Sequence, residues 1–108
     1  MAAIPERCED GASGLDKDGL AAMLGELHGD WSVEGGKCIQ RVVRARDFVH
    51  GLEMLNAVGA AAEEENHHPD VSIRDYRIFT VVLTTHDVDG LSPNDFVMAR
   101  RVDAIVEG

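Results

Sequence analysis

Three of the five histidines occupy positions where their side chains could carry out acid–base chemistry together. His67 and His68 are adjacent, and His86 follows a stretch rich in β-branched and aromatic residues. Imidazole both donates and accepts protons near neutral pH. A hairpin running from residue 71 to residue 86 would bring its start and its end together, and all three rings with them. The sequence therefore predicts a histidine acid–base site at one end of a sheet.

Two other interpretations of these histidines stay open. A metal site would use neutral imidazoles joined by cysteine or carboxylate ligands. The adjacent pair His67-His68 disfavours this interpretation, because neighbouring side chains in an extended segment diverge. The rings could also serve only to satisfy hydrogen bonds in their loops. His28 and His50 are interpreted as surface or helix-end residues.

Apolar residues recur at helical spacing in three segments, which predicts three helices. Each segment follows a Ser or Asp suited to capping a helix, and Pro93 fits the first helical position of the third. We expect the first helix to begin after residue 13 or 16 and to end at Gly29, and the second to run from residue 48 to about Glu64. The core face expected for the second helix is Phe48, Leu52, Leu55, Val58 and Ala62.

Extended segments lie between these helices. Gly35-Gly36 predicts a hairpin that joins strands over 31–34 and 38–44. Two further strands are predicted over 71–74 and 76–85. The order helix, strand, strand, helix, strand, strand, helix predicts an α+β fold with a four-stranded antiparallel sheet and three helices on one face. We expect one domain over 14–108, after a flexible lead-in over 1–13.

Charge and composition narrow the classes of partner. The chain has 108 residues and a formal net charge of −10, which disfavours direct binding to nucleic acid. No apolar run is long enough to span a membrane, and residues 1–14 lack the apolar core of a signal peptide. Cys8 and Cys38 lack metal-type spacing and are read as reduced thiols. We therefore expect a cytoplasmic protein without a metal.

A longer pattern includes the three histidines. The pattern has seven positions at fixed spacings from one another. It resembles the signature of the pterin-4a-carbinolamine dehydratases. The resemblance extends from about Leu15 to Val106. The seven positions are Glu63, His67, His68, Pro69, Tyr76, His86 and Asp95.

The resemblance implies an activity and a set of partners. Such proteins dehydrate 4a-hydroxytetrahydropterin to quinonoid dihydropterin, which recycles tetrahydrobiopterin spent by aromatic amino-acid hydroxylases, and they need no metal or organic cofactor. They assemble as homodimers or homotetramers. Some also act as dimerisation cofactors of a hepatocyte homeodomain factor. A non-catalytic binding protein of the same fold is therefore the alternative function.

The resemblance also implies roles for single residues. His67 and His86 would form the acid–base pair, and His68 would contact and orient the pterin. Glu63 would hold a histidine or help to bind the substrate, and Thr85 would help to bind the ring. Asp95 would tune a histidine, although a carboxylate in the first turn of a helix is also favoured by the helix dipole. Tyr76 shares the strand parity of His86 and would be either a pocket wall or an ordinary sheet residue.

Overall fold

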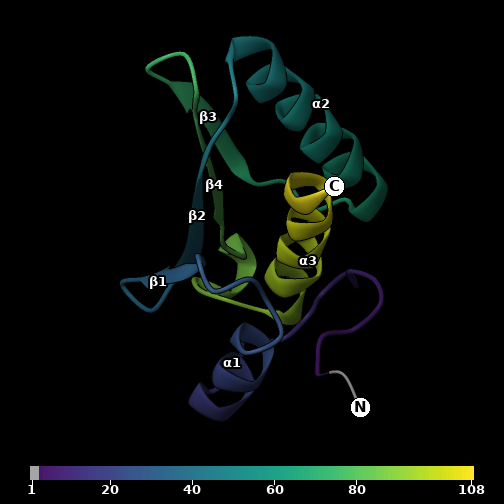
Figure 1. Ribbon diagram of the computed structural model, residues 1–108. Coiled ribbons are helices and arrows are strands. Elements are labelled where there is room, and N and C mark those ends of the chain that lie inside the picture. The colour runs from purple at the N-terminus through teal and green to yellow at the C-terminus, as the bar shows by residue number, and fades with distance from the viewer. Residues whose placement is uncertain (1–2) are drawn as a thin grey trace.

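Four antiparallel strands form one sheet, and helices lie along one of its faces (Figure 1). The computed structural model describes residues 3–108. The strand order across the sheet is β1-β2-β4-β3, and the chain order α-β-β-α-β-β-α confirms the predicted fold class. The elements are α1 (Lys17–Leu24), β1 (Ser32–Glu34), β2 (Cys38–Arg44), α2 (Phe48–Glu65), β3 (Asp70–Arg74), β4 (Ile78–Leu83), the 3₁₀ turn η1 (His86–Val88) and α3 (Pro93–Glu107).

Two tight turns connect the paired strands. Gly35 and Gly36 have φ angles of 60° and 71°, a conformation that glycine adopts without strain, and this confirms the predicted first hairpin. The second hairpin differs from the prediction. Asp75 and Tyr76 have φ angles of 49° and 55° and lie in the turn, so that β4 begins at Ile78 rather than at residue 76.

Side-chain caps begin the three helices. The carboxylates of Asp16 and Asp47 accept hydrogen bonds from the first turns of α1 and α2, as the sequence predicts. The predicted end of the first helix at Gly29 is wrong, because α1 ends at Leu24 and Gly25 is its C-cap.

The core lies between the sheet and the pair α2 and α3. The face that α2 buries matches the predicted one at Val58 and Ala62 and differs at Phe48 and Leu52, which are 48% and 39% exposed. Gly51 explains the difference: a β-carbon at this position would meet Ile73 Cδ1 at 3.3 Å, so the bare backbone of α2 approaches β3 there. The buried residues of α2 are Gly51, Met54, Val58, Ala61 and Ala62.

Residues 3–13, where the sequence predicts a flexible lead-in, form no helix or strand and lie against the helices. Ile4 is 3% exposed and belongs to the core cluster. The amide of Cys8 donates to Glu65 Oε1 at 2.9 Å, and the side chain of Arg100 donates to the carbonyl of Pro5 at 2.6 Å. These contacts join this segment to the end of α2 and to α3.

Candidate active site

A left-handed residue at the end of α2 sets the direction of the histidine loop. Asn66 caps α2 with φ 52° and ψ 40°, and asparagine tolerates this conformation better than most residues. The amides of Asn66 and His67 both donate to the carbonyl of Ala62. The chain thus leaves the helix axis at Asn66 and passes through His67 and His68 to the start of β3.

His67 is held by a buried carboxylate of α3. Its Nε2 atom lies 2.7 Å from Oδ1 of Asp95. The side chain of His67 is 13% exposed and that of Asp95 is fully buried. The first turn of α3 therefore fixes one face of the predicted histidine site.

Asp95 is the centre of a buried polar network. Its Oδ2 atom accepts from the amide of Ser92 at 3.0 Å and from Thr85 Oγ1 at 2.7 Å. Because an ionised carboxylate only accepts, the Thr85 hydroxyl donates to Asp95, and the Ser92 hydroxyl, 2.7 Å away, must then donate to Thr85. The amide of Asn94 in turn donates to Ser92 Oγ. The hydroxyl groups thus form a chain that runs in one direction and ends on Asp95.

His86 reaches the same region from the loop that follows β4. It is the first residue of η1, directly after Thr85. The loop that follows is closed by an isolated bridge between Thr85 and Gly90, with an N···O distance of 2.7 Å. His86 is exposed, whereas Thr85 is buried in the polar network.

One cavity of about 250 Å³ is bordered by all three predicted histidines. It lies between the loop that follows α2 and the loop that follows β4. The structure therefore brings His67, His68, His86 and Thr85 together, although they come from two distant parts of the chain. The lining residues are Asn66, His67, His68, Thr84, Thr85, His86 and Asp87.

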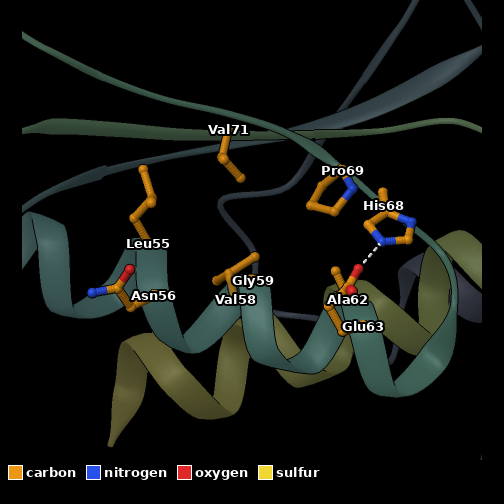
Figure 2. Close-up of a pocket in the computed structure, with 9 residues that line it drawn as sticks. All are labelled: Leu55, Asn56, Val58, Gly59, Ala62, Glu63, His68, Pro69 and Val71. Carbon is orange, nitrogen blue, oxygen red and sulfur yellow. Dashed lines mark hydrogen bonds and ion pairs between the residues drawn. The ribbon is translucent and has the colours of Figure 1, made fainter.

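Glu63 and His68 are hydrogen-bonded to each other beside this cavity, which His68 lines. The pair joins Oε2 of Glu63 to Nε2 of His68 (Figure 2). Their side chains are 77% and 55% exposed, so the pair lies in contact with solvent. His68 follows Glu63 by five positions, and the end of α2 brings the two together.

Tyr76 is not brought to the cavity. It lies in the turn that precedes β4, whereas His86 follows the other end of that strand. Its side chain is 57% exposed, and the guanidinium of Arg77 lies 5.6 Å from the centre of its ring. The parity argument for Tyr76 fails because the residue is not part of the strand.

Four residues of the site were not among the predicted ones: Asn66, Thr84, Asp87 and Ser92. Ser92 was recognised only as a helix cap, yet its fully buried hydroxyl also belongs to the Asp95 network. Asn66 lines the cavity and turns the chain toward it. Their sequence positions, a capping residue and an asparagine at a helix end, were the available signals.

This arrangement is suited to proton transfer. An ionised Asp95 accepts from Thr85 and Ser92 at Oδ2 and from a proton on Nε2 of the His67 ring at Oδ1. In the neutral ring this leaves Nδ1 of His67 as the atom that can accept a proton. Across residues 3–108, no group of three or more His, Cys, Asp or Glu side chains is placed to hold a metal ion. No helix within that range is long and apolar enough to cross a membrane.

Comparison with known proteins identifies close matches over most of the chain. The sequence model of the family described as pterin 4 alpha carbinolamine dehydratase matches residues 13–105. A protein of Rickettsia bellii, named provisionally as a pterin-4-alpha-carbinolamine dehydratase, is 34% identical over 91% of this chain and 86% of its own length. A protein of Mycobacterium bovis with the same provisional name is 38% identical over 84% of this chain and 94% of its own length.

Two solved structures resemble this one. The crystal structure of a transcriptional coactivator/pterin dehydratase from Brucella melitensis superposes with a TM-score of 0.80 and 28% identity, over 87% of this chain and 99% of that one. A pterin dehydratase-like protein described as a RuBisCO assembly factor of the alpha-carboxysome superposes with a TM-score of 0.62 and 20% identity, over 73% of this chain and 92% of that one. The second likeness concerns the fold alone.

Proposed function

The chain belongs to the pterin 4 alpha carbinolamine dehydratase family, and on this premise we propose that it dehydrates 4a-hydroxytetrahydropterin to quinonoid dihydropterin. The reaction would serve the recycling of tetrahydrobiopterin. One observation supports the proposal above others: three histidines border a single cavity, and a buried carboxylate orients one of them.

The proposed reaction requires two proton transfers, at two atoms that are bonded to the same ring carbon. The hydroxyl oxygen on the ring carbon gains a proton and leaves as water when the carbon–oxygen bond breaks. The neighbouring ring nitrogen loses its proton, and its electrons form the carbon–nitrogen double bond of the product. A pair of imidazoles, one protonated and one neutral, can supply both transfers near neutral pH.

His67 and His86 are the proposed acid–base pair. Because Asp95 holds the proton of His67 on Nε2, His67 is assigned as the base that takes the ring-nitrogen proton at Nδ1. His86 is then the acid that protonates the leaving hydroxyl. Its exposure lets it recover a proton from water after each turnover.

Three further residues complete the proposed site. His68 contacts and orients the pterin, and Glu63 holds the His68 ring through their hydrogen bond. Thr85 lies beside His86 and assists in binding the ring. Asp95 is a positioning residue, since it is fully buried and acts through His67.

The test is the ultraviolet decay of enzymatically generated 4a-hydroxytetrahydropterin with and without the protein. The compound also dehydrates spontaneously, so the rate without protein is the reference. We expect acceleration at catalytic protein levels, its loss in the double variant His67→Ala, His86→Ala, and its retention in the matched control His28→Ala. His28 lies outside the cavity and pairs with Asp30.

A non-catalytic binding protein of the same fold is the alternative function. The likeness to an assembly factor motivates this alternative through the fold only. The decay experiment separates the two. If correctly folded wild-type protein gives no acceleration, the alternative replaces the enzyme proposal.

We further propose a cytoplasmic homodimer or homotetramer that is coupled to an aromatic amino-acid hydroxylase and does not bind nucleic acid. β3 is an edge strand, which offers unpaired backbone groups to a second copy. Phe48, Val49 and Leu52 are exposed apolar residues of α2 that a second copy would bury. Sedimentation as a monomer at micromolar concentration would contradict the oligomer proposal.

A further inference from the structure

A second cavity continues from the cavity that the three histidines border, which is here called the histidine cavity. The second cavity has a volume of about 200 Å³ and is here called the N-terminal pocket. Residues 9–12 and Asn94 form the part of its lining that the histidine cavity lacks. The two cavities are parts of one cleft, because four residues line both. The shared residues are Asn66, His67, Thr85 and Asp87.

The N-terminal segment is held in place at this pocket by hydrogen bonds on both sides. The amide of Glu9 donates to Oδ1 of Asn94 at 2.9 Å, and Nδ2 of Asn94 donates to the carbonyl of Glu9 at 2.8 Å. Further along the chain, the amide of Leu15 donates to the carbonyl of Leu91 at 2.9 Å. Figure 1 shows the segment, in purple, beside α3. The chain between these anchors is therefore a wall of the cleft.

This wall has no role that the family assigns to it. The family model matches residues 13–105, and residues 9–12 precede that range. Only the contacts of the wall in this structure can therefore indicate what it does. Those contacts place it across the N-terminal pocket from His67, the proposed base.

The N-terminal pocket is suited to neutral hydroxyl groups and disfavours anions. Glu9, Asp10 and Asp87 line it with carboxylates, which accept hydrogen bonds from a hydroxyl group and repel another carboxylate. Within the described part of the chain, no Lys or Arg side chain lines the pocket. The ring of His67 is already hydrogen-bonded to Asp95, so its proton on Nε2 is not available to an anion in the pocket.

We propose that the N-terminal pocket binds the substituent of the pterin ring while the ring occupies the histidine cavity, and that it selects a neutral, hydroxyl-bearing substituent over a carboxylate. The inference rests on the proposed function and specifies its substrate class. It agrees with the recycling of tetrahydrobiopterin, whose side chain carries hydroxyl groups. Asn94 is a positioning residue, since it holds the wall through Glu9.

The experiment compares stable, fully oxidised pterins that differ only in a small 6-substituent. The probes are 6-hydroxymethylpterin, 6-methylpterin and 6-carboxypterin, and binding at pH 7 is followed by their own fluorescence. We expect the hydroxymethyl compound to bind about tenfold more tightly than the methyl compound, because it gains a hydrogen bond to a charged acceptor. The carboxy compound should bind more weakly than the methyl compound, because the carboxylates of the lining repel it.

One variant tests the charge of the wall. Asp10→Asn removes a carboxylate and keeps the shape of an exposed side chain. We expect it to raise the affinity for the carboxy compound relative to the hydroxymethyl compound by about threefold to tenfold. The matched control is Asp18→Asn, which changes the net charge equally at an exposed position of α1 outside the pocket and should leave this ratio unchanged.

A second variant tests the position of the wall. Asn94→Ala removes both hydrogen bonds to Glu9, and we expect it to bring the affinities for the hydroxymethyl and methyl compounds close to each other. The matched control is Arg100→Ala, which releases the same segment from α3 at residues 4–6, outside the pocket lining. It should keep the wild-type ratio.

Two results would overturn the inference while leaving the proposed function intact. The first is a wild-type affinity for the carboxy compound that equals or exceeds that for the hydroxymethyl compound. The second is wild-type selectivity in a folded Asp10→Asn variant, which tests the inference even if Asn94→Ala fails to fold. If no probe binds, the inference also fails, and the decay of 4a-hydroxytetrahydropterin then decides the proposed function separately.

Discussion

The Nε2 atom of His67 lies 2.7 Å from Oδ1 of Asp95, and the same aspartate caps the start of α3. In this capping box the Ser92 hydroxyl accepts from the backbone amide of Asp95, and the Asp95 carboxylate accepts from the backbone amide of Ser92. One buried carboxylate therefore both orients a histidine of the cavity and stabilises a helix. Activity and stability are coupled at this residue.

We expect Asp95→Asn to lower the dehydration rate about 10²-fold or more, because the amide no longer holds a proton on Nε2 of His67. It should also cost about 1–3 kcal/mol of unfolding free energy, since the accepting carboxylate is lost. Stopped-flow absorbance and urea unfolding measure the two effects.

The matched control is Ser92→Ala, which removes the capping hydroxyl and leaves the pair of His67 and Asp95 in place. We expect it to cost about 1 kcal/mol with little change in rate. A folded Asp95→Asn variant with the wild-type rate would contradict the positioning role of Asp95.

The protein should lose more stability when the partner of Arg41 is removed than when Arg41 itself is replaced by an apolar residue. Arg41 is 4% exposed and donates to Asp103 Oδ1 at 2.6 Å. We expect Asp103→Ala to cost about 3–5 kcal/mol, because it removes the closer partner of the buried Arg41 and leaves only the half-exposed Glu107. Arg41→Met should cost less, because the Asp103 carboxylate still accepts from Trp31 Nε1 and from the His28 amide. Urea unfolding measures both. Glu107→Gln, at the exposed end of the same cluster, is the control and should cost under about 1 kcal/mol. Equal costs for Asp103→Ala and Glu107→Gln would contradict this prediction.

Glu65 should contribute stability that is lost in acid. Burial by itself would raise the pKa of Glu65, but hydrogen bonds from the Cys8 amide and from Arg101 hold the pKa below its ordinary value of 4.5. A group whose pKa is lower in the folded state stabilises the fold above its unfolded pKa, and this stability disappears as the pH falls through the folded pKa. We expect Glu65→Gln to cost about 1–2 kcal/mol at pH 7 and progressively less below about pH 4.5.

Urea unfolding of both proteins between pH 7 and pH 3 measures this difference. Glu64→Gln is the control, since Glu64 pairs with the same Arg101 but is 59% exposed. A difference between wild type and Glu65→Gln that stays constant across this range would argue against the role of the ionised carboxylate.

Cys8 should resist alkylation in the folded protein. Burial, together with the negative charge of Glu65, raises the pKa of the Cys8 thiol to about 12. At pH 8 the reactive thiolate is then a fraction on the order of 10⁻⁴. We expect iodoacetamide to label Cys38 first and Cys8 only after unfolding, as mass spectrometry would detect. Labelling of both cysteines at the same rate would contradict this expectation, and Glu65→Gln should make labelling of Cys8 faster.

The order of the elements was predictable because local signals specify it. The pair Gly35-Gly36 marks a turn that needs positive φ, and Asp47 and Ser92 mark helix starts. The rotation of α2 was not predictable in this way. Phe48 and Leu52 fit the apolar period, but Gly51, which approaches Ile73, is the residue buried in this part of the helix. That contact depends on tertiary packing and has no signal in the local spacing.

The candidate site was predictable in its residue types and only partly in its geometry. The convergence of His67 and His86 follows from the hairpin between them, which the strand pattern specifies. Tyr76 was misplaced because two successive non-glycine residues with positive φ are rare, and the β-rich composition of that segment favours a strand. The second role of Ser92 depends on the distance between Thr85 and α3, which only the folded chain determines.

The left-handed turn at Asn66 makes the site depend on the last turn of α2. The amides of Asn66 and His67 share the carbonyl of Ala62 as their acceptor, so both bonds break together when that turn frays. Hydrogen–deuterium exchange at these two amides therefore reports how often His67 leaves its place beside Asp95. A ligand that occupies the histidine cavity will slow the exchange of both amides by the same factor.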